Sequence, residues 1–242
     1  MAQLRQVPRM LEMKDVNSAY GRAHILYDLS LSAKRGEVVV LLGRNGAGKS
    51  TTLKTLIGLV RPRSGEISFD GRRIEQFEPY QIARLGLGYV PEDRRIFTDL
   101  SVMENLEVGR QAPRAGAPRW TPEKLFQLFP NLAGMRDRPG ARMSGGEQQM
   151  LTIARTLMGN PSAILLDEPS EGLAPVIVEQ MARTILELKQ EGLCVLLSEQ
   201  NLHFANLVAD RAYIIEKGHI RYQGTMAELA ANNQMRATYL SV

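Results

Sequence analysis

Hydrophobic residues alternate with other positions early in the chain in the way that a half-buried strand requires. The alternating apolar positions are Ile25, Tyr27, Leu29 and Leu31. Their period of two predicts a strand with one buried face. A turn at Gly36 precedes the uninterrupted apolar run 38–42. A run of this kind is typical of a strand that is covered on both faces.

The pattern changes to helical spacing after residue 51. The apolar positions of this predicted helix are Leu53, Leu56, Ile57 and Val60. Ile67 and Phe69 then alternate again and predict a short strand. The first third of the chain therefore reads as strand, loop, helix and strand.

The middle of the chain, from about Gln76 to Met143, reads as helical segments interrupted by proline and glycine. The stretch 111–119 is too poor in apolar residues to bury surface of its own, so we expect an exposed loop there. Thr121 followed by Pro122 has the pattern of a helix N-cap with proline at the first helical position.

The last hundred residues return to alternating elements. The apolar runs 163–166 and 194–197 predict strands, and the helix between them is expected to end near Gly192. A turn at 217–218 predicts a hairpin between the stretches 212–216 and 220–222. Strand–helix–strand repeats imply an α/β fold with a parallel sheet and helices packed on it.

Composition narrows the class of protein. The 242 residues carry 30 Lys and Arg against 26 Asp and Glu, a net charge of +4, and 44% are hydrophobic. We therefore expect one globular domain over 1–242, and we expect no nucleic-acid partner because the arginines are dispersed. Cys194 is the only cysteine and is predicted to be inert packing. The first residues lack the apolar stretch of a secretory signal, and no apolar run reaches the roughly 18–20 residues that span a bilayer.

A complete phosphate-binding loop follows the predicted strand 38–42 and opens the predicted helix. The segment Gly43–Ser50 fits the pattern G-x-x-x-x-G-K-[ST]. Glycines let successive amide groups turn toward phosphate oxygens, Lys49 supplies a charge for the β- and γ-phosphates, and Ser50 supplies an oxygen for Mg²⁺. The predicted nucleotide contacts here are Gly43, Arg44, Asn45, Gly46, Ala47, Gly48, Lys49, Ser50 and Thr51.

Two acidic residues stand at the end of the apolar run 163–166. A hard divalent cation needs an anionic anchor, and Asp167 is expected to hold Mg²⁺, mainly through its water shell. Glu168 is then positioned to orient and deprotonate an attacking water molecule. The sequence predicts ATP and Mg²⁺ as the ligands of this site.

The segment Met143–Gln149, which precedes these acids, resembles the signature motif of ATP-binding-cassette (ABC) ATPases. Ser144 and Glu147 have the spacing of a capping box, and Gly145 and Gly146 permit the close approach of an anionic group. The resemblance covers about residues 10–240. It implies the P-loop NTPase fold of this family, with a mixed, mainly parallel central sheet, an antiparallel β edge and a helical lobe at about 82–155.

The resemblance also implies partners. In the family two subunits join head to tail, so Ser144, Gly145, Gly146 and Glu147 of one would face the nucleotide on Lys49 of the other. The second subunit is the same chain or a related ATPase. Two integral membrane permease subunits would complete the assembly at the cytoplasmic face of the membrane, with a periplasmic or extracellular solute-binding protein acting indirectly. The predicted contact with the permease is Phe97, Leu100 and Val102, whose alternative is packing inside the helical lobe.

Single positions refine the comparison with the family. Tyr20 resembles the aromatic residue that stacks on adenine, and its alternative is a core tyrosine. Glu92 stands where the family has glutamine and is expected to contact nucleotide and metal. Gln200 replaces the usual switch histidine as a third catalytic residue beside Lys49 and Glu168; His203 is a less favoured substitute. Ala174 replaces an aspartate.

Three segments resemble the ATPase subunits of branched-chain amino acid importers: 89–97, 168–175 and 197–201. The resemblance implies ATP hydrolysis coupled to uptake of hydrophobic amino acids. ATPases of urea and short-amide importers are closely similar and remain an alternative. A non-transport ABC ATPase and a regulatory protein without turnover are the other classes considered, and Glu168 argues against the second of these.

Overall fold

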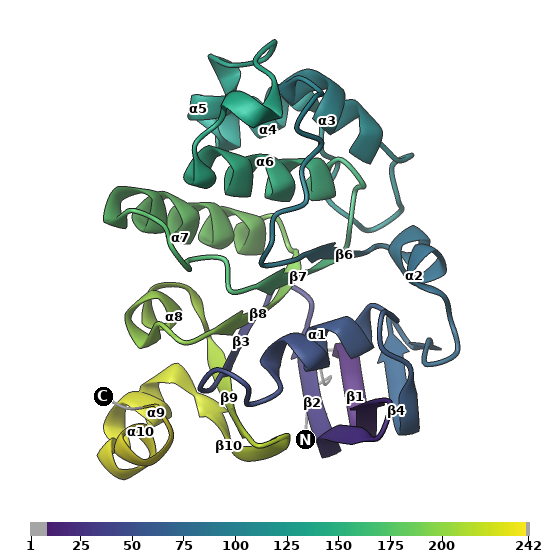
Figure 1. Cartoon of the computed structure of the whole chain (residues 1–242), viewed down its shortest axis with the longest axis vertical. Coiled ribbons are helices and arrows are strands. Elements are labelled where there is room, and N and C mark those ends of the chain that lie inside the picture. The colour runs from purple at the N-terminus through teal and green to yellow at the C-terminus, as the bar shows by residue number, and fades with distance from the viewer. Residues whose placement is uncertain (1–8, 241–242) are drawn as a thin grey trace, which may run out of the picture.

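The protein has two β-sheets and a set of helices in a computed structural model that describes residues 9–240 (Figure 1). Residues 1–8 and 241–242 of the predicted domain lie outside the described residues. The expectation that the first residues hold no secretory signal falls on this undescribed part. The predicted division, with a helical lobe at about 82–155, stays a prediction. The fold class is α/β, as predicted.

The smaller sheet is antiparallel, in the order β2-β1-β4-β5. Its strands are β1 (Arg9–Tyr20), β2 (Ala23–Lys34), β4 (Pro62–Phe69) and β5 (Arg72–Arg73). The larger sheet has the order β10-β9-β3-β8-β7-β6 and is parallel except for β10 at its edge. Its strands are β3 (Val38–Leu42), β6 (Leu87–Val90), β7 (Ala163–Asp167), β8 (Cys194–Glu199), β9 (Arg211–Glu216) and β10 (His219–Thr225).

The helices lie around the larger sheet. They are α1 (Lys49–Leu56), α2 (Pro79–Leu85), α3 (Val102–Gly109), α4 (Pro122–Leu128), α5 (Pro130–Ala133), the short 3₁₀ helix η1 (Gly140–Arg142), α6 (Gly145–Leu157), α7 (Pro175–Gln190), α8 (Leu202–Val208), α9 (Met226–Ala231) and α10 (Asn233–Tyr239). In Figure 1 the helices α3–α6 gather at the top and α9 and α10 at the bottom, so the larger sheet joins two ends of the molecule.

Strand β3 shows why the apolar runs have no polar face. Val38, Val40 and Leu42 belong to the core shared with α6 and α7, whereas Val39 and Leu41 belong to the core shared with the antiparallel sheet. Both faces are therefore covered, as the run 38–42 predicts. Cys194 on the neighbouring strand β8 is fully buried, and burial raises the pKa of its thiol to about 12. It is inert packing, as predicted.

Most predicted elements are present. The strands over 25–31, 38–42, 163–166 and 194–197, the helix between the last two and the hairpin at 217–218 all form. Thr121 caps α4 by accepting a hydrogen bond from the Lys124 amide, with Pro122 at the first helical position. The stretch 111–119 is a loop. Helix α1 ends at Leu56, so Val60 is a buried residue of the following turn rather than part of the helix.

Strands β1 and β6 are present but were not predicted. In β1 the pairing with β2 shifts register between Met13 and Val16, and Asp15 there has a left-handed backbone with φ +49°. The bulge breaks the period of two on which strand prediction depends. Strand β6 has only four residues and pairs with β7.

The turn of the β9–β10 hairpin holds the phosphate loop. The Gly218 amide donates to the Ala47 carbonyl (2.8 Å), and the Gly218 carbonyl accepts from the Tyr27 amide (3.0 Å). Gly218 has φ +80°, and a Cβ atom there would overlap the carbonyl oxygen of Ile25. Only glycine fits, so one residue connects β2, the hairpin and the loop.

No helix among residues 9–240 combines the length and the apolar character needed to span a membrane.

Candidate functional site

A cavity of about 420 Å³ lies where β3 gives way to α1. It is lined by predicted site residues and by two that were not predicted, Ile25 and Glu171. The predicted ones are Asn45, Gly46, Gly48, Lys49, Ser50, Thr51, Glu92 and Glu168. The remaining predicted loop residues do not line it: Gly43 and Ala47 are buried, and Arg44 is exposed.

The loop backbone leaves amide groups available for an anion. Gly48 is the N-cap of α1 with φ +115°, no side chain caps this helix, and its first turn carries no acidic residue. At Gly43 a Cβ atom would lie 2.5 Å from the Ile215 carbonyl oxygen, so the loop requires glycine to pack on β9. An uncapped helix N-terminus with a positive field is suited to phosphate.

The Lys49 ammonium group is buried inside the loop. It donates to the carbonyl oxygens of Gly43 (2.9 Å) and Arg44 (3.3 Å), and it forms an ion pair with the Glu168 carboxylate at 3.0 Å. The side chains of the pair are only 3% and 7% exposed. A buried charge of this kind needs a partner, and here the predicted phosphate ligand and the predicted general base neutralise each other.

Asp167 at the end of β7 is 1% exposed and accepts hydrogen bonds from three hydroxyl groups. Ser50 (3.0 Å) and Ser198 (2.7 Å) donate to Oδ1, and Tyr89 donates to Oδ2 at 3.3 Å. The pairing of Ser50 with Asp167 matches the predicted site. The sequence interpretation gave no role to Ser198 or Tyr89, although Ser198 stands out as a polar residue ending an apolar strand.

Glu168 directly follows β7 in a left-handed backbone conformation with φ +47°. Its amide donates to Ser198 Oγ (3.0 Å), which fixes this unusual turn, and its Oε2 accepts from Gln200 Nε2 at 2.8 Å. Burial acts to raise the pKa of Glu168. Hydrogen bonds from Glu171, Gln200 and Lys49 outweigh it, so the pKa lies below the ordinary value. Gln200 and Glu168 are thus brought together, as predicted.

Two further acids surround Glu168. Glu199, at the end of β8, accepts hydrogen bonds from the amides of Ser170, Gln200 and Asn201 and ties the two loops together; burial nevertheless raises its pKa. A hydrogen bond with Glu168, burial and neighbouring carboxylates raise the pKa of Glu171 to about 7. Neither Glu171 nor Glu199 was predicted as a site residue, although they lie in the segments 168–175 and 197–201, whose resemblance to importer ATPases is described above.

The oxygen donors here fit a magnesium ion held with the help of a nucleotide. Asp167 is a buried carboxylate bonded only to hydroxyl groups, and Ser50 stands beside it. Glu92 is an exposed acid that lines the cavity together with Ser50 and a neighbouring cavity together with Asp167. Nowhere in residues 9–240 do three or more His, Cys, Asp or Glu side chains cluster as a metal site. That sparse set suits Mg²⁺, which is usually bound by one or two carboxylates together with substrate phosphates and water.

The predicted signature segment does not reach this cavity. Ser144 caps α6 by accepting from the Glu147 amide, while the Glu147 carboxylate accepts from the Ser144 amide, so the predicted capping box forms. Gly145 packs against Arg94 and Gly146 against Ile177. Tyr20 is exposed at the end of β1, not in the core, and does not line the cavity.

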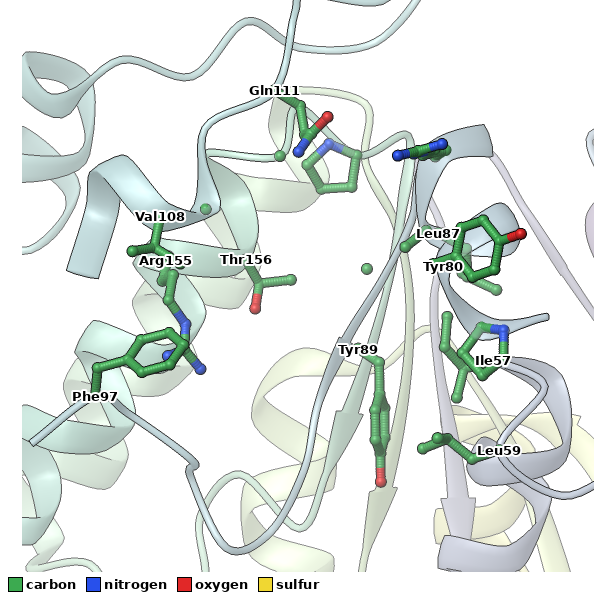
Figure 2. Close-up of a pocket in the computed structure, with 17 residues that line it drawn as sticks. Ile57, Leu59, Tyr80, Leu87, Tyr89, Phe97, Val108, Gln111, Arg155 and Thr156 are labelled. Carbon is green, nitrogen blue, oxygen red and sulfur yellow. The ribbon is translucent and has the colours of Figure 1, made fainter. Parts of the chain in front are cut away.

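An apolar groove of about 560 Å³ lies on another part of the surface, between α2, β6, α3 and α6 (Figure 2). Its exposed apolar residues are Leu59, Tyr80, Phe97 and Val108. The predicted permease contacts divide: Phe97 is exposed and lines the groove, and Leu100 is half-buried outside it. The prediction was wrong for Val102, which is fully buried because it begins α3 and packs in the core.

Comparison with known proteins gives consistent matches. Residues 26–171 match the family described as ABC transporter. The chain is 43% identical to the high-affinity branched-chain amino acid transport ATP-binding protein BraG of Pseudomonas aeruginosa, over 96% of this chain and 99% of BraG. It is 36% identical to the lipopolysaccharide export system ATP-binding protein LptB of Escherichia coli strain K12, over 95% and 96%.

A solved structure has the same fold. The ADP conformation of MJ1267, an ATP-binding cassette of an ABC transporter, superposes with a TM-score of 0.78 at 27% identity and covers 92% of this chain and 94% of that one.

Proposed function

The chain belongs to the ABC transporter ATPases, and from this premise we propose that it powers the uptake of branched-chain amino acids through separate membrane subunits. Membership of the family makes it an ATP-binding and ATP-hydrolysing protein. The observation that supports the catalytic part is the contact of Lys49 with Glu168 and of Ser50 with Asp167 beside the phosphate-loop cavity, which Lys49, Ser50 and Glu168 line. The similarity to BraG over nearly the whole of both chains supports the transport part.

The loop residues 43–51 bind the triphosphate through backbone amides, and Lys49 moves from Glu168 to the β- and γ-phosphates. Ser50, Asp167 and Glu92 hold Mg²⁺, which neutralises phosphate charge when it is bound. Tyr20 stacks on the adenine ring. These roles complete a nucleotide site around the cavity.

Glu168 acts as the general base. Its carboxylate accepts a proton from water as the water oxygen bonds to the γ-phosphorus, and the bond from that phosphorus to the bridging oxygen breaks with its electron pair leaving on ADP. Gln200 donates to Glu168 (2.8 Å) and fixes its direction. Gln200 cannot carry a proton, so the proton stays on Glu168 or passes to phosphate.

A second subunit completes the site. ABC ATPases work as dimers, and here Ser144, Gly145, Gly146 and Glu147 lie apart from the cavity of their own chain. We propose that they contact the nucleotide of a partner, which is a second copy or a related ATPase. Because neither subunit then has a full site alone, hydrolysis requires the dimer.

The membrane partner docks in the apolar groove of Figure 2. Arg84 and Arg155 line this groove, and its lining includes no acidic residue. Burial lowers the pKa of Arg155, whose Nη1 has no hydrogen-bond partner within the described part of the chain. The groove therefore fits a short amphipathic helix with a carboxylate, presented by a permease subunit at the cytoplasmic face of the membrane. A solute-binding protein outside the membrane would act through that permease.

Phosphate release by the wild type and by Glu168→Gln tests the enzymatic part. We expect the variant to lose at least about 100-fold in rate, the lower end of the range for a general base, while it still binds ATP. Glu179→Gln, an exposed acid on α7, is the matched control. A wild type as inert as the variant when its partners are present would contradict the proposal.

Reconstitution with the membrane subunits encoded beside it tests the solute. ATP-driven uptake of leucine but not urea supports the proposal, and uptake of urea alone favours the short-amide alternative. Failure with every small solute would favour an export role of the kind named for LptB.

A further inference from the structure

Tyr89 joins the apolar groove to the predicted magnesium site. It lies on β6, its ring lines the groove, and its hydroxyl donates to Asp167 Oδ2 at 3.3 Å. In Figure 2 the ring stands between Phe97 and Leu59, with the hydroxyl pointing away from Gln111. One side chain thus touches both the surface proposed for the permease and the carboxylate proposed for the metal.

The hydrogen bond from Tyr89 has no duplicate on that oxygen. Asp167 Oδ1 accepts from Ser50 and Ser198, whereas Oδ2 accepts from Tyr89 alone among residues 9–240. Without this donor, a carboxylate that is 1% exposed would keep one oxygen without a hydrogen bond. A buried anion in that state is costly, so Tyr89 holds the second oxygen of Asp167 while the two serines hold the first.

Tyr89 is held in position to donate this hydrogen bond. Its backbone is fixed because β6 pairs with β7, with Tyr89 opposite Leu165. A partner that covers the groove would therefore act on Tyr89 through its side chain, whose rotation about the Cα–Cβ bond moves the hydroxyl relative to Asp167.

We propose that Tyr89 is a positioning residue that orients Asp167 for Mg²⁺ and makes this orientation respond to what occupies the groove. The inference rests on the proposed function, because it requires a nucleotide-bound metal and a groove partner. It adds a connection between them that runs through one side chain.

Tyr89→Phe removes only the hydroxyl, and Tyr239→Phe is its matched control. Tyr239 ends α10, lines neither the groove nor the phosphate-loop cavity, and its hydroxyl makes no hydrogen bond within residues 9–240. Calorimetry with ATP, with and without Mg²⁺, and electron paramagnetic resonance with Mn²⁺ measure binding without turnover. We expect Tyr89→Phe to lose about 10–100-fold in metal affinity, the usual effect of removing a hydrogen bond to a metal ligand, and to keep its metal-free ATP affinity.

Equal metal affinity in Tyr89→Phe and Tyr239→Phe would overturn the inference. An equal loss of metal-free ATP binding in Tyr89→Phe would also overturn it, because that result means general damage to the site. A wild type that binds no ATP at all would instead refute the proposed function, so the two failures are distinguishable.

The response to the groove is tested in the assembled transporter. Apparent Mg²⁺ affinity is compared between the free subunit and the complex with its membrane subunits. We expect assembly to change this affinity in the wild type and in Tyr239→Phe but not in Tyr89→Phe. The same change in all three proteins would overturn the connection.

Discussion

Gly218→Ala should weaken both the fold and the nucleotide site, and Gly71→Ala is its matched control. Both glycines have left-handed backbones, with φ +80° and φ +76°. A Cβ atom at Gly71 meets nothing within 4 Å, whereas one at Gly218 would overlap the Ile25 carbonyl and lie 2.9 Å from the Tyr27 ring. The two variants therefore share the backbone strain and differ only in the clash.

The expected magnitudes follow from that difference. A left-handed alanine costs about 1 kcal/mol of unfolding free energy once the stiffer unfolded chain is considered, which is the whole effect at Gly71. At Gly218 overpacking adds about 1–3 kcal/mol, and losing one of the hydrogen bonds to Ala47 and Tyr27 adds about 1 kcal/mol. The total of about 3–5 kcal/mol corresponds to a fall in Tm of about 10 °C, against about 2–4 °C for the control.

Thermal unfolding and calorimetric titration with ATP measure the two consequences. Because Gly218 donates to Ala47 of the phosphate loop, its variant should also bind ATP more weakly than Gly71→Ala does. If both variants lose the same stability, the assigned clash is wrong. If only stability falls, the hairpin does not hold the loop in its binding conformation.

Three more changes have defined outcomes. Ala174 is the N-cap of α7, and its side chain makes no capping hydrogen bond. Ala174→Asp should therefore raise the unfolding free energy by about 0.5–2 kcal/mol, and Tm with it. An unchanged Tm in thermal unfolding would contradict this. Glu171 keeps its proton to about pH 7 when folded but only to about 4.5 when unfolded. The folded state therefore binds more protons between these values, and its stability falls as pH rises through them. Urea unfolding at pH 5 and pH 8 should show a smaller fall for Glu171→Gln, and equal falls would refute the assignment. Phe97→Ser should abolish transport and preserve ATP binding, and loss of both would count against its role in docking.

Sequence patterns predicted the parts of this protein in which one physical rule acts alone. The runs in β3, β7 and β8 are apolar at every position because two cores share each strand, and the phosphate loop is recognisable because few residue types permit its backbone. Strand β1 was not predicted because the bulge at Asp15 interrupts its period of two. Strand β6 was not predicted because its four residues carry too little pattern. Val102 was predicted on the surface and is buried, because an apolar residue in a segment proposed to contact a partner can still pack in the core.

The site was predictable only where a residue does chemistry directly. Lys49, Ser50, Asp167, Glu168 and Gln200 are brought into contact, as their motifs suggested. The residues that hold them were missed, because a hydrogen bond between strands far apart in sequence leaves no local pattern. Ser198 reaches Asp167 across 31 positions and Tyr89 across 78.

The ion pair between Lys49 and Glu168 has a consequence for the resting subunit. Each group serves as the other's counter-ion, so neither of these two buried charges stands alone. In the reaction proposed above, the same pairing would also keep Glu168 from acting as the base, because its carboxylate is engaged with Lys49. A triphosphate that draws the ammonium group toward itself would release this carboxylate when the substrate is present, so nucleotide binding and activation of the base would be one event.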